Sequence, residues 1–178
     1  MHTHHLHLLI LACLLPAGLR AGVIDSSATG FTILHEASID ARATDVYRAI
    51  TRDWGGWWDS NHSFSGDAAN FRMDTRPGGG LYERLPDGGF VEHLHLVHLV
   101  PNRLIRLQGG LGPLTELGLH GVLSFDIQTT ETGCTLRLTY IVHGYLPGGV
   151  QSIASPVDGV LSLQVRRLKR YVEQSKYK

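Results

Sequence analysis

Apolar and polar residues alternate along most of the chain after residue 30. In the first such run Phe31, Ile33, Ala37 and Ile39 fall on one side, which is typical of a half-buried strand. Further runs of this kind cover residues 71–73, 81–85, 90–100, 104–107, 118–127 and 134–145, separated by short turns rich in glycine and proline. Short turns join antiparallel neighbours, so the pattern predicts an antiparallel sheet of about six to seven strands.

Two segments follow a helical period instead. A short helix is expected over residues 41–52, where Val46 and Ile50 stand four apart and Asp40 is placed to cap the first turn. A long C-terminal helix is expected from the cap Ser155, with Pro156 in its first turn. Its apolar stripe consists of Val157, Val160, Leu161, Val165, Leu168 and Val172.

Several local motifs accompany this order of elements. They are Trp57-Trp58-Asp59, Pro77-Gly78-Gly79-Gly80 before Tyr82-Glu83, Pro101 with Arg103-Leu104, and residues 133–139. In this order the chain resembles the START-like (SRPBCC) superfamily, in particular polyketide cyclases/dehydrases and the C-terminal domains of heat-shock-protein ATPase activators. The resemblance covers about residues 30–174. It implies an α+β helix-grip fold, in which a curved antiparallel sheet wraps around the C-terminal helix and encloses a ligand cavity.

The length of 178 residues suits one domain, which we place at residues 31–174 after a short extension at 22–30. Residues 1–21 are interpreted as a signal peptide, because the apolar run from Leu6 to Leu15 is too short to cross a bilayer. We therefore expect an exported, periplasmic protein with no stable membrane span in the mature chain. A lipoprotein anchored at Cys13 is the alternative.

Composition narrows the expected partners. Sixteen basic and sixteen acidic side chains give zero net charge, which does not favour a nucleic-acid partner. Cleavage after Ala21 leaves Cys134 as the single cysteine, which begins a strand and is expected to be inert. We find no motif for a cofactor.

Glu83 lies between Leu81 and Leu85 on an alternating strand, so it is expected to face inward with them. His35 likewise shares a face with Ile33. A buried carboxylate near a histidine can act in acid–base catalysis, and Glu83, His35 and His93 are the candidate catalytic residues. The alternative is a structural ion pair between Glu83 and Arg72 or Arg106.

His93 and His95 stand two apart on one strand, so a regular strand would point both to one face, with His98 on the other. Such a pair is a weak candidate for a metal site, with Glu83 as a third ligand. The alternatives are exposed polar positions on the sheet and a pH-sensitive lining of the cavity.

Aromatic residues are the candidates for contact with a ligand. The candidate ligand-binding residues are Trp57, Trp58, Tyr82, Glu83, Phe125, Tyr140 and Leu161, with Tyr145 as a further aromatic. The glycine-rich loop at 109–114 is a candidate lid.

The sequence is compatible with three functions. The first is binding of a small hydrophobic molecule between the sheet and the C-terminal helix. The second is a cyclase, dehydratase or hydrolase that uses Glu83 with His35 or His93. The third is a protein-interaction module that presents its sheet or the Trp54–Trp58 segment to a partner, as the resemblance to ATPase activators implies.

Overall fold

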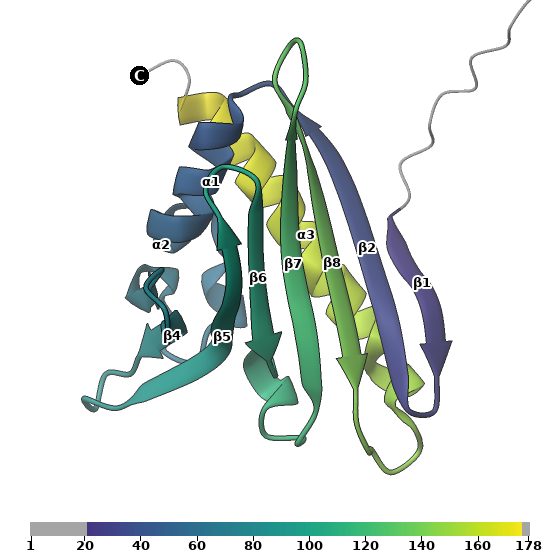
Figure 1. Ribbon diagram of the computed structural model, residues 1–178. Helices are drawn as coiled ribbons and strands as arrows, with labels where there is room; N and C mark the ends of the chain where they lie inside the picture. The colour runs from purple at the N-terminus through teal and green to yellow at the C-terminus, as the bar shows by residue number, and fades with distance from the viewer. Residues whose placement is uncertain (1–20, 176–178) are drawn as a thin grey trace, which may run out of the picture.

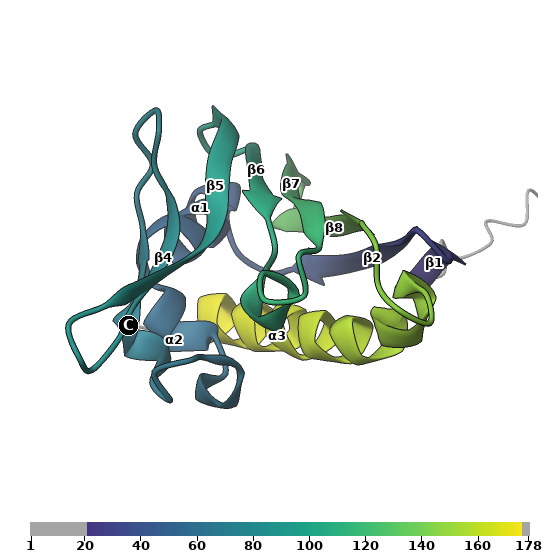
Figure 2. The same cartoon turned by 90° about the horizontal axis from the view of Figure 1, so that it is seen from below.

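The computed structural model describes residues 21–175. Eight antiparallel strands form one sheet in the order β1-β2-β8-β7-β6-β5-β4-β3. A long helix, α3 (Ala154–Ser175), lies along one face of this sheet (Figures 1 and 2). The expected α+β helix-grip architecture is therefore confirmed, with eight strands in place of six to seven. The strands are β1 (Gly22–Ser27), β2 (Gly30–Ile39), β3 (Phe71–Met73), β4 (Gly80–Arg84), β5 (Phe90–Val100), β6 (Leu104–Gly109), β7 (His120–Thr129) and β8 (Cys134–His143).

The additional strand is β1, which occupies most of the expected extension at 22–30. It pairs with β2 at the edge of the sheet, and its residues are largely exposed. Because β1 buries little apolar surface, its sequence lacks the strong alternation that marks the other strands.

Two short helices precede β3: α1 (Ala43–Arg52) and α2 (Trp54–Trp57). Single 3-10 turns lie at Ser60–His62, Ala68–Asn70, Gly112–Leu114 and Val150–Ile153. The prediction that Asp40 caps α1 is wrong, because the helix begins two residues later than expected and its N-cap is Arg42. The 3-10 turn at Val150–Ile153 runs directly into α3, so the expected cap Ser155 lies within the first helical turn.

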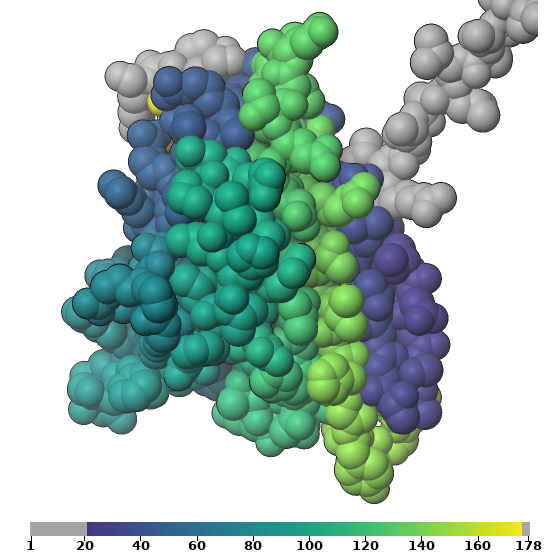
Figure 3. Space-filling view, in the orientation of Figure 1, coloured from purple at the N-terminus to yellow at the C-terminus, as the bar shows by residue number. Residues whose placement is uncertain are grey.

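The inner face of the sheet and the apolar stripe of α3 form the core. Leu161, Val165, Leu168 and Val172 are buried as the stripe predicted, whereas Val157 and Val160 are only half-buried. No described helix covers the opposite face of the sheet, which Figure 3 views directly. Among residues 21–175, no helix combines the length and the apolar character that a bilayer span requires. Residues 1–20 of the expected export signal, with Cys13, lie outside the described residues.

The three tryptophans belong to the core and form no exposed surface. Trp54, Trp57 and Trp58 are each at most 4% exposed. Their indole N–H groups donate to the backbone oxygens of Ile50, Ala49 and His62, respectively. Arg167 of α3 donates to the carbonyls of Trp57 and Trp58 and so ties this cluster to the long helix. The expectation that Trp54–Trp58 forms a contact surface for a partner is therefore wrong, because these rings complete the core at one end of the helix.

Candidate functional site

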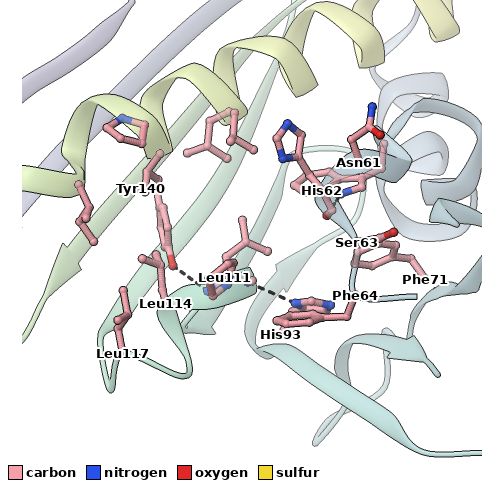
Figure 4. Close-up of a pocket in the computed structure, with 18 residues that line it drawn as sticks. Asn61, His62, Ser63, Phe64, Phe71, His93, Leu111, Leu114, Leu117 and Tyr140 are labelled. Carbon is pink, nitrogen blue, oxygen red and sulfur yellow. Dashed lines mark hydrogen bonds between the residues drawn. The ribbon is translucent and has the colours of Figure 1, made fainter. Parts of the chain in front are cut away.

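A cavity of about 470 Å³ lies between the sheet and the first half of α3 (Figure 4). Its walls come from β5, β8, α3, the β6–β7 loop and the segment at 61–64. Most of the side chains around it are apolar, and the volume is in the range of small-molecule sites. The lining residues are Trp58, Asn61, His62, Ser63, Phe64, Phe71, His93, Leu111, Gly112, Pro113, Leu114, Leu117, Tyr140, Ile153, Pro156, Val157, Val160 and Leu161.

Glu83 and His93 form a buried pair at the wall of this cavity. His93 Nε2 lies 2.9 Å from Glu83 Oε2, and Glu83 is fully buried while His93 is 2% exposed. The prediction that Glu83 faces inward is confirmed. Its alternative, an ion pair with arginine, is wrong: Arg106 donates to Ser124 Oγ, and Arg72 donates to the carbonyls of Ala69 and Phe71.

The hydrogen bonds of Glu83 keep it ionised. Burial is the largest single effect and would raise the pKa of Glu83, but hydrogen bonds from Ser65, Phe64 and His93 together outweigh it, so the pKa lies below 4.5. The backbone N–H of Ser65 donates to Oε1 at 2.6 Å and that of Phe64 to Oε2 at 3.1 Å. A carboxylate in this state can only accept hydrogen bonds, so the proton on His93 Nε2 is the one that it receives.

His93 is correspondingly neutral. Burial lowers the pKa of His93 below 6.5, although the hydrogen bond to Glu83 acts in the opposite direction. Its other ring nitrogen, Nδ1, accepts a hydrogen bond of 3.3 Å from the backbone N–H of Gly112 in the β6–β7 loop. The ring also stacks against Phe64 and Phe71. The hydrogen bonds at the two ring nitrogens therefore specify the same tautomer. The proton is on Nε2, and Nδ1 is the acceptor at the cavity.

A β-bulge decides which histidine of β5 faces inward. The register between β4 and β5 shifts at this point: Leu81 lies opposite Leu94, while the neighbouring Tyr82 lies opposite Glu92. His93 is the extra residue and turns to the same face as Leu94, whereas His95 is exposed. The prediction that His93 and His95 share a face is therefore wrong. His95 Nδ1 lies 3.2 Å from Glu92 Oε1 on the outer face. Within residues 21–175, no group of three metal-ligating side chains is arranged to hold an ion.

His35 is separate from this pair. It is buried as predicted, but its Nε2 lies 2.8 Å from Asp158 Oδ1 of α3, at ion-pair distance although outside hydrogen-bond geometry. His35 does not line the cavity. Of the two histidines considered as partners for Glu83, the structure brings only His93 to it.

The aromatic candidates divide into three groups. Trp58 and Tyr140, together with Leu161, line the cavity. Trp57 and Phe125 are buried in the core beside Trp54, away from the lining. Tyr82 packs against Phe90 on the outer face, because it alternates with the inward Leu81 and Glu83, and Tyr145 is 83% exposed.

Tyr140 holds the β6–β7 loop at the cavity. Its hydroxyl donates to the carbonyl of Gly109 at 3.1 Å and accepts from the N–H of Leu111 at 3.0 Å. Burial raises the pKa of Tyr140 to about 12, so the phenol stays protonated. The loop expected as a lid thus lies over the cavity through Leu111, Gly112, Pro113 and Leu114.

Sequence reasoning missed two parts of the lining. The segment from Asn61 to Phe64 carries no periodic pattern, and only the fold brings it opposite β5. Val157 and Val160 were recognised as part of the apolar stripe of α3, but a stripe does not reveal which of its residues face a cavity and which face a packed core.

Comparisons with known proteins support the fold. No family model matches the chain, and no curated protein matches its sequence. Solved structures do match. The Aha1 dimer from Colwellia psychrerythraea is 20% identical with a TM-score of 0.59, over 80% of this chain and 96% of that chain. A protein from Nitrosomonas europaea is 13% identical with a TM-score of 0.59, over 86% and 100% of the two chains. An uncharacterized protein from Rhizobium leguminosarum is 19% identical with a TM-score of 0.55, over 82% and 95%. At these identities the similarity establishes the fold alone.

Proposed function

We propose that the protein is an exported START-like (SRPBCC) domain that binds a small hydrophobic molecule in the cavity between the sheet and α3. The observation that carries this proposal is the cavity of about 470 Å³ with its largely apolar lining. The pocket is partly open to solvent, so its apolar walls expose hydrophobic surface to water, and an apolar ligand seated there would remove that surface from water. Export to the periplasm is proposed on the basis of the N-terminal sequence alone.

Filling the cavity tests the binding function directly. Val160 lines the cavity from α3 and is half-buried, so Val160→Trp places a large ring in the space that the ligand would use. The matched control is Arg170→Trp, which adds the same side chain at an exposed position of the same helix. We expect an environment-sensitive apolar dye to bind the unmodified protein and the control, and to lose at least tenfold in affinity for Val160→Trp.

Native mass spectrometry of the purified protein supplies an independent measurement. A stoichiometric organic molecule that is released on denaturation, and that is absent from Val160→Trp, supports the proposal and gives the chemical class. A protein that carries no such molecule and binds no apolar dye contradicts the proposal.

A second candidate is an acid–base enzyme, which the Glu83–His93 pair favours. Nδ1 of a neutral imidazole can accept a proton from a bound substrate, and the ionised carboxylate at Nε2 stabilises the imidazolium that forms. The test is deuterium exchange at the carbon next to the carbonyl of a bound ketone such as 2-tetralone. Exchange faster than in buffer, and lost in His93→Gln, supports catalysis; equal rates in the protein and its variant exclude it for this substrate class.

The expected protein partner remains a prediction of the sequence. With the tryptophans buried, it would have to use another surface, such as the outer face of the sheet (Figure 3).

A further inference from the structure

The composition of the cavity lining favours an uncharged ligand. Among the described residues that line it, there is no aspartate, glutamate, lysine or arginine. The ionised carboxylate of Glu83 lies directly behind His93, to which it is hydrogen-bonded. A charged group of the ligand would therefore lose its hydration without gaining a partner of opposite charge, and an anion would also be repelled by Glu83.

Most polar atoms of the lining are already engaged or lie at its exposed rim. The Tyr140 hydroxyl donates to Gly109 at the end of β6 and accepts from Leu111 in the β6–β7 loop. Ser63 Oγ donates to the carbonyl of Ser60, and the side chains of Asn61 and His62 are exposed. Two buried side-chain acceptors at the cavity therefore receive an N–H of the β6–β7 loop. The Tyr140 hydroxyl is bonded to the chain at two points, whereas His93 Nδ1 has a single, longer bond to Gly112.

The hydrogen bond from Gly112 to His93 is one that a ligand could replace. At 3.3 Å it is long for a hydrogen bond, and Gly112 sits in open surroundings, where an added Cβ would meet no atom within 4 Å. By contrast, the ring of His93 is fixed by Glu83 and by stacking against Phe64 and Phe71. The acceptor is therefore held rigidly, while the donor lies on a loop with open space beside it, next to the Leu111 N–H that Tyr140 binds.

We propose that the ligand is an uncharged, largely apolar molecule with a hydroxyl group, which inserts between His93 Nδ1 and the Gly112 N–H. The ligand hydroxyl donates to Nδ1, and its oxygen accepts from Gly112. This inference rests on the proposed ligand-binding function and specifies its ligand. An ether or a ketone offers an acceptor but no donor for Nδ1, and a carboxylate brings the disfavoured negative charge.

Two matched series of probes test the inference by calorimetry at pH 7.5. The flat series is 2-naphthol, 2-methoxynaphthalene and 2-naphthoate, and the linear series is 1-decanol, decyl methyl ether and decanoate. Within the series that binds, we expect the hydroxyl compound to bind about tenfold more tightly than its methyl ether, which corresponds to one hydrogen bond. We expect the carboxylate to bind more weakly than either.

Variants assign the preference to His93. His93→Phe removes the acceptor and should abolish the difference between hydroxyl and ether, while His93→Gln retains an acceptor oxygen and should restore part of it. His95→Phe, on the outer face of the same strand and outside the cavity, is the control and should keep the full difference. Circular dichroism establishes that each variant is folded.

The unmodified protein gives a readout that does not depend on any variant folding. In an NMR titration, the amide resonance of Gly112 should shift with the hydroxyl probe, and it should shift far less with the methyl ether. Binding of hydroxyl and ether with equal affinity, or tightest binding of the carboxylate, overturns this inference while the proposed cavity function stands. Failure of every probe in both series to bind contradicts the proposed function itself, and this inference with it.

Discussion

His93 shows how surrounding groups set the state of one side chain. A histidine in solution populates two neutral tautomers and, near pH 6.5, a cation. Here the carboxylate of Glu83 holds a proton on Nε2, and the Gly112 N–H requires a lone pair on Nδ1. Burial further disfavours the cation. The neutral form with the proton on Nε2 is therefore the state that the fold selects.

This selection predicts a loss of stability in acid. Because the pKa of His93 is lowered from 6.5 by burial, the unfolded chain binds a proton more readily than the folded chain does. The free energy of unfolding should therefore fall as the pH falls from 7 to 5. The pKa of Glu83 is also lowered, from 4.5, so its stabilising contribution is lost at still lower pH, in the same direction.

Urea denaturation at pH 7, 6 and 5 measures the effect. His93→Gln, which keeps a donor for Glu83 and an acceptor for Gly112 without titrating, should show a shallower dependence. The difference in slope should not exceed about 1.4 kcal/mol per pH unit, the value for one proton. The control Asn61→Gln alters an exposed residue that does not titrate, and it should retain the slope of the unmodified protein. Equal slopes for all three proteins would show that His93 does not titrate on unfolding in this range.

Glycines have opposite roles in the sheet and in the long helix. Gly80 in β4 pairs with His95 of β5, next to the bulge, and an added Cβ would collide with the backbone carbonyl of Leu94. Gly159 is exposed in α3, and an added Cβ there would meet no atom within 4 Å. The first glycine thus permits close pairing of β4 with β5 beside the bulge at His93, while the second only adds conformational freedom to the unfolded chain.

The two alanine substitutions should therefore change stability in opposite directions. We expect Gly159→Ala to raise the free energy of unfolding by about 0.5–1 kcal/mol, since glycine is unfavourable inside a helix. We expect Gly80→Ala to lower it and to reduce dye binding in the cavity, because the strands must separate around Leu94. Thermal unfolding followed by circular dichroism measures both variants. A Gly80→Ala protein as stable as the unmodified one would mean that β4 adjusts without cost.

The first strand and the turn after it contact the connection between β8 and α3. Beyond its pairing with β2, the segment after it receives two backbone hydrogen bonds: Val150 donates to the carbonyl of Ala28, and Gly144 donates to that of Thr29. These bonds position the connection between β8 and α3, which leads into the part of the helix that lines the cavity. An edge strand with little apolar burial thereby supports the site from a distance.

Truncation tests this support. A chain that begins at Gly30 should unfold at a lower temperature than one that begins at Gly22, because it loses β1 and leaves Val150 and Gly144 without their acceptors. A loss of at least about 1 kcal/mol corresponds to a shift of about 2–4 °C for a domain of this size. The shorter chain should also bind the apolar dye less tightly. Identical melting temperatures would contradict the structural role assigned to this strand.

The pattern of apolar residues determined most of the architecture. Burial on one side of a strand forces a period of two, and burial on one side of a helix forces a period of 3.6, so seven strands and both main helices are visible in the sequence. The inward position of Glu83 followed from the same rule. The exposed strand β1 has no buried face and so leaves little trace in the pattern.

The tertiary structure decided the details of the site. Whether His93 shares a face with His95 depends on a single extra residue in β5, and a one-residue shift reverses the face of a side chain without changing the composition of the strand. The choice of His93 over an arginine or His35 as partner for Glu83 is likewise a matter of distance between residues far apart in the chain. Sequence periodicity records which residues are buried, whereas a binding site depends on which buried residues meet, and only the folded chain establishes that.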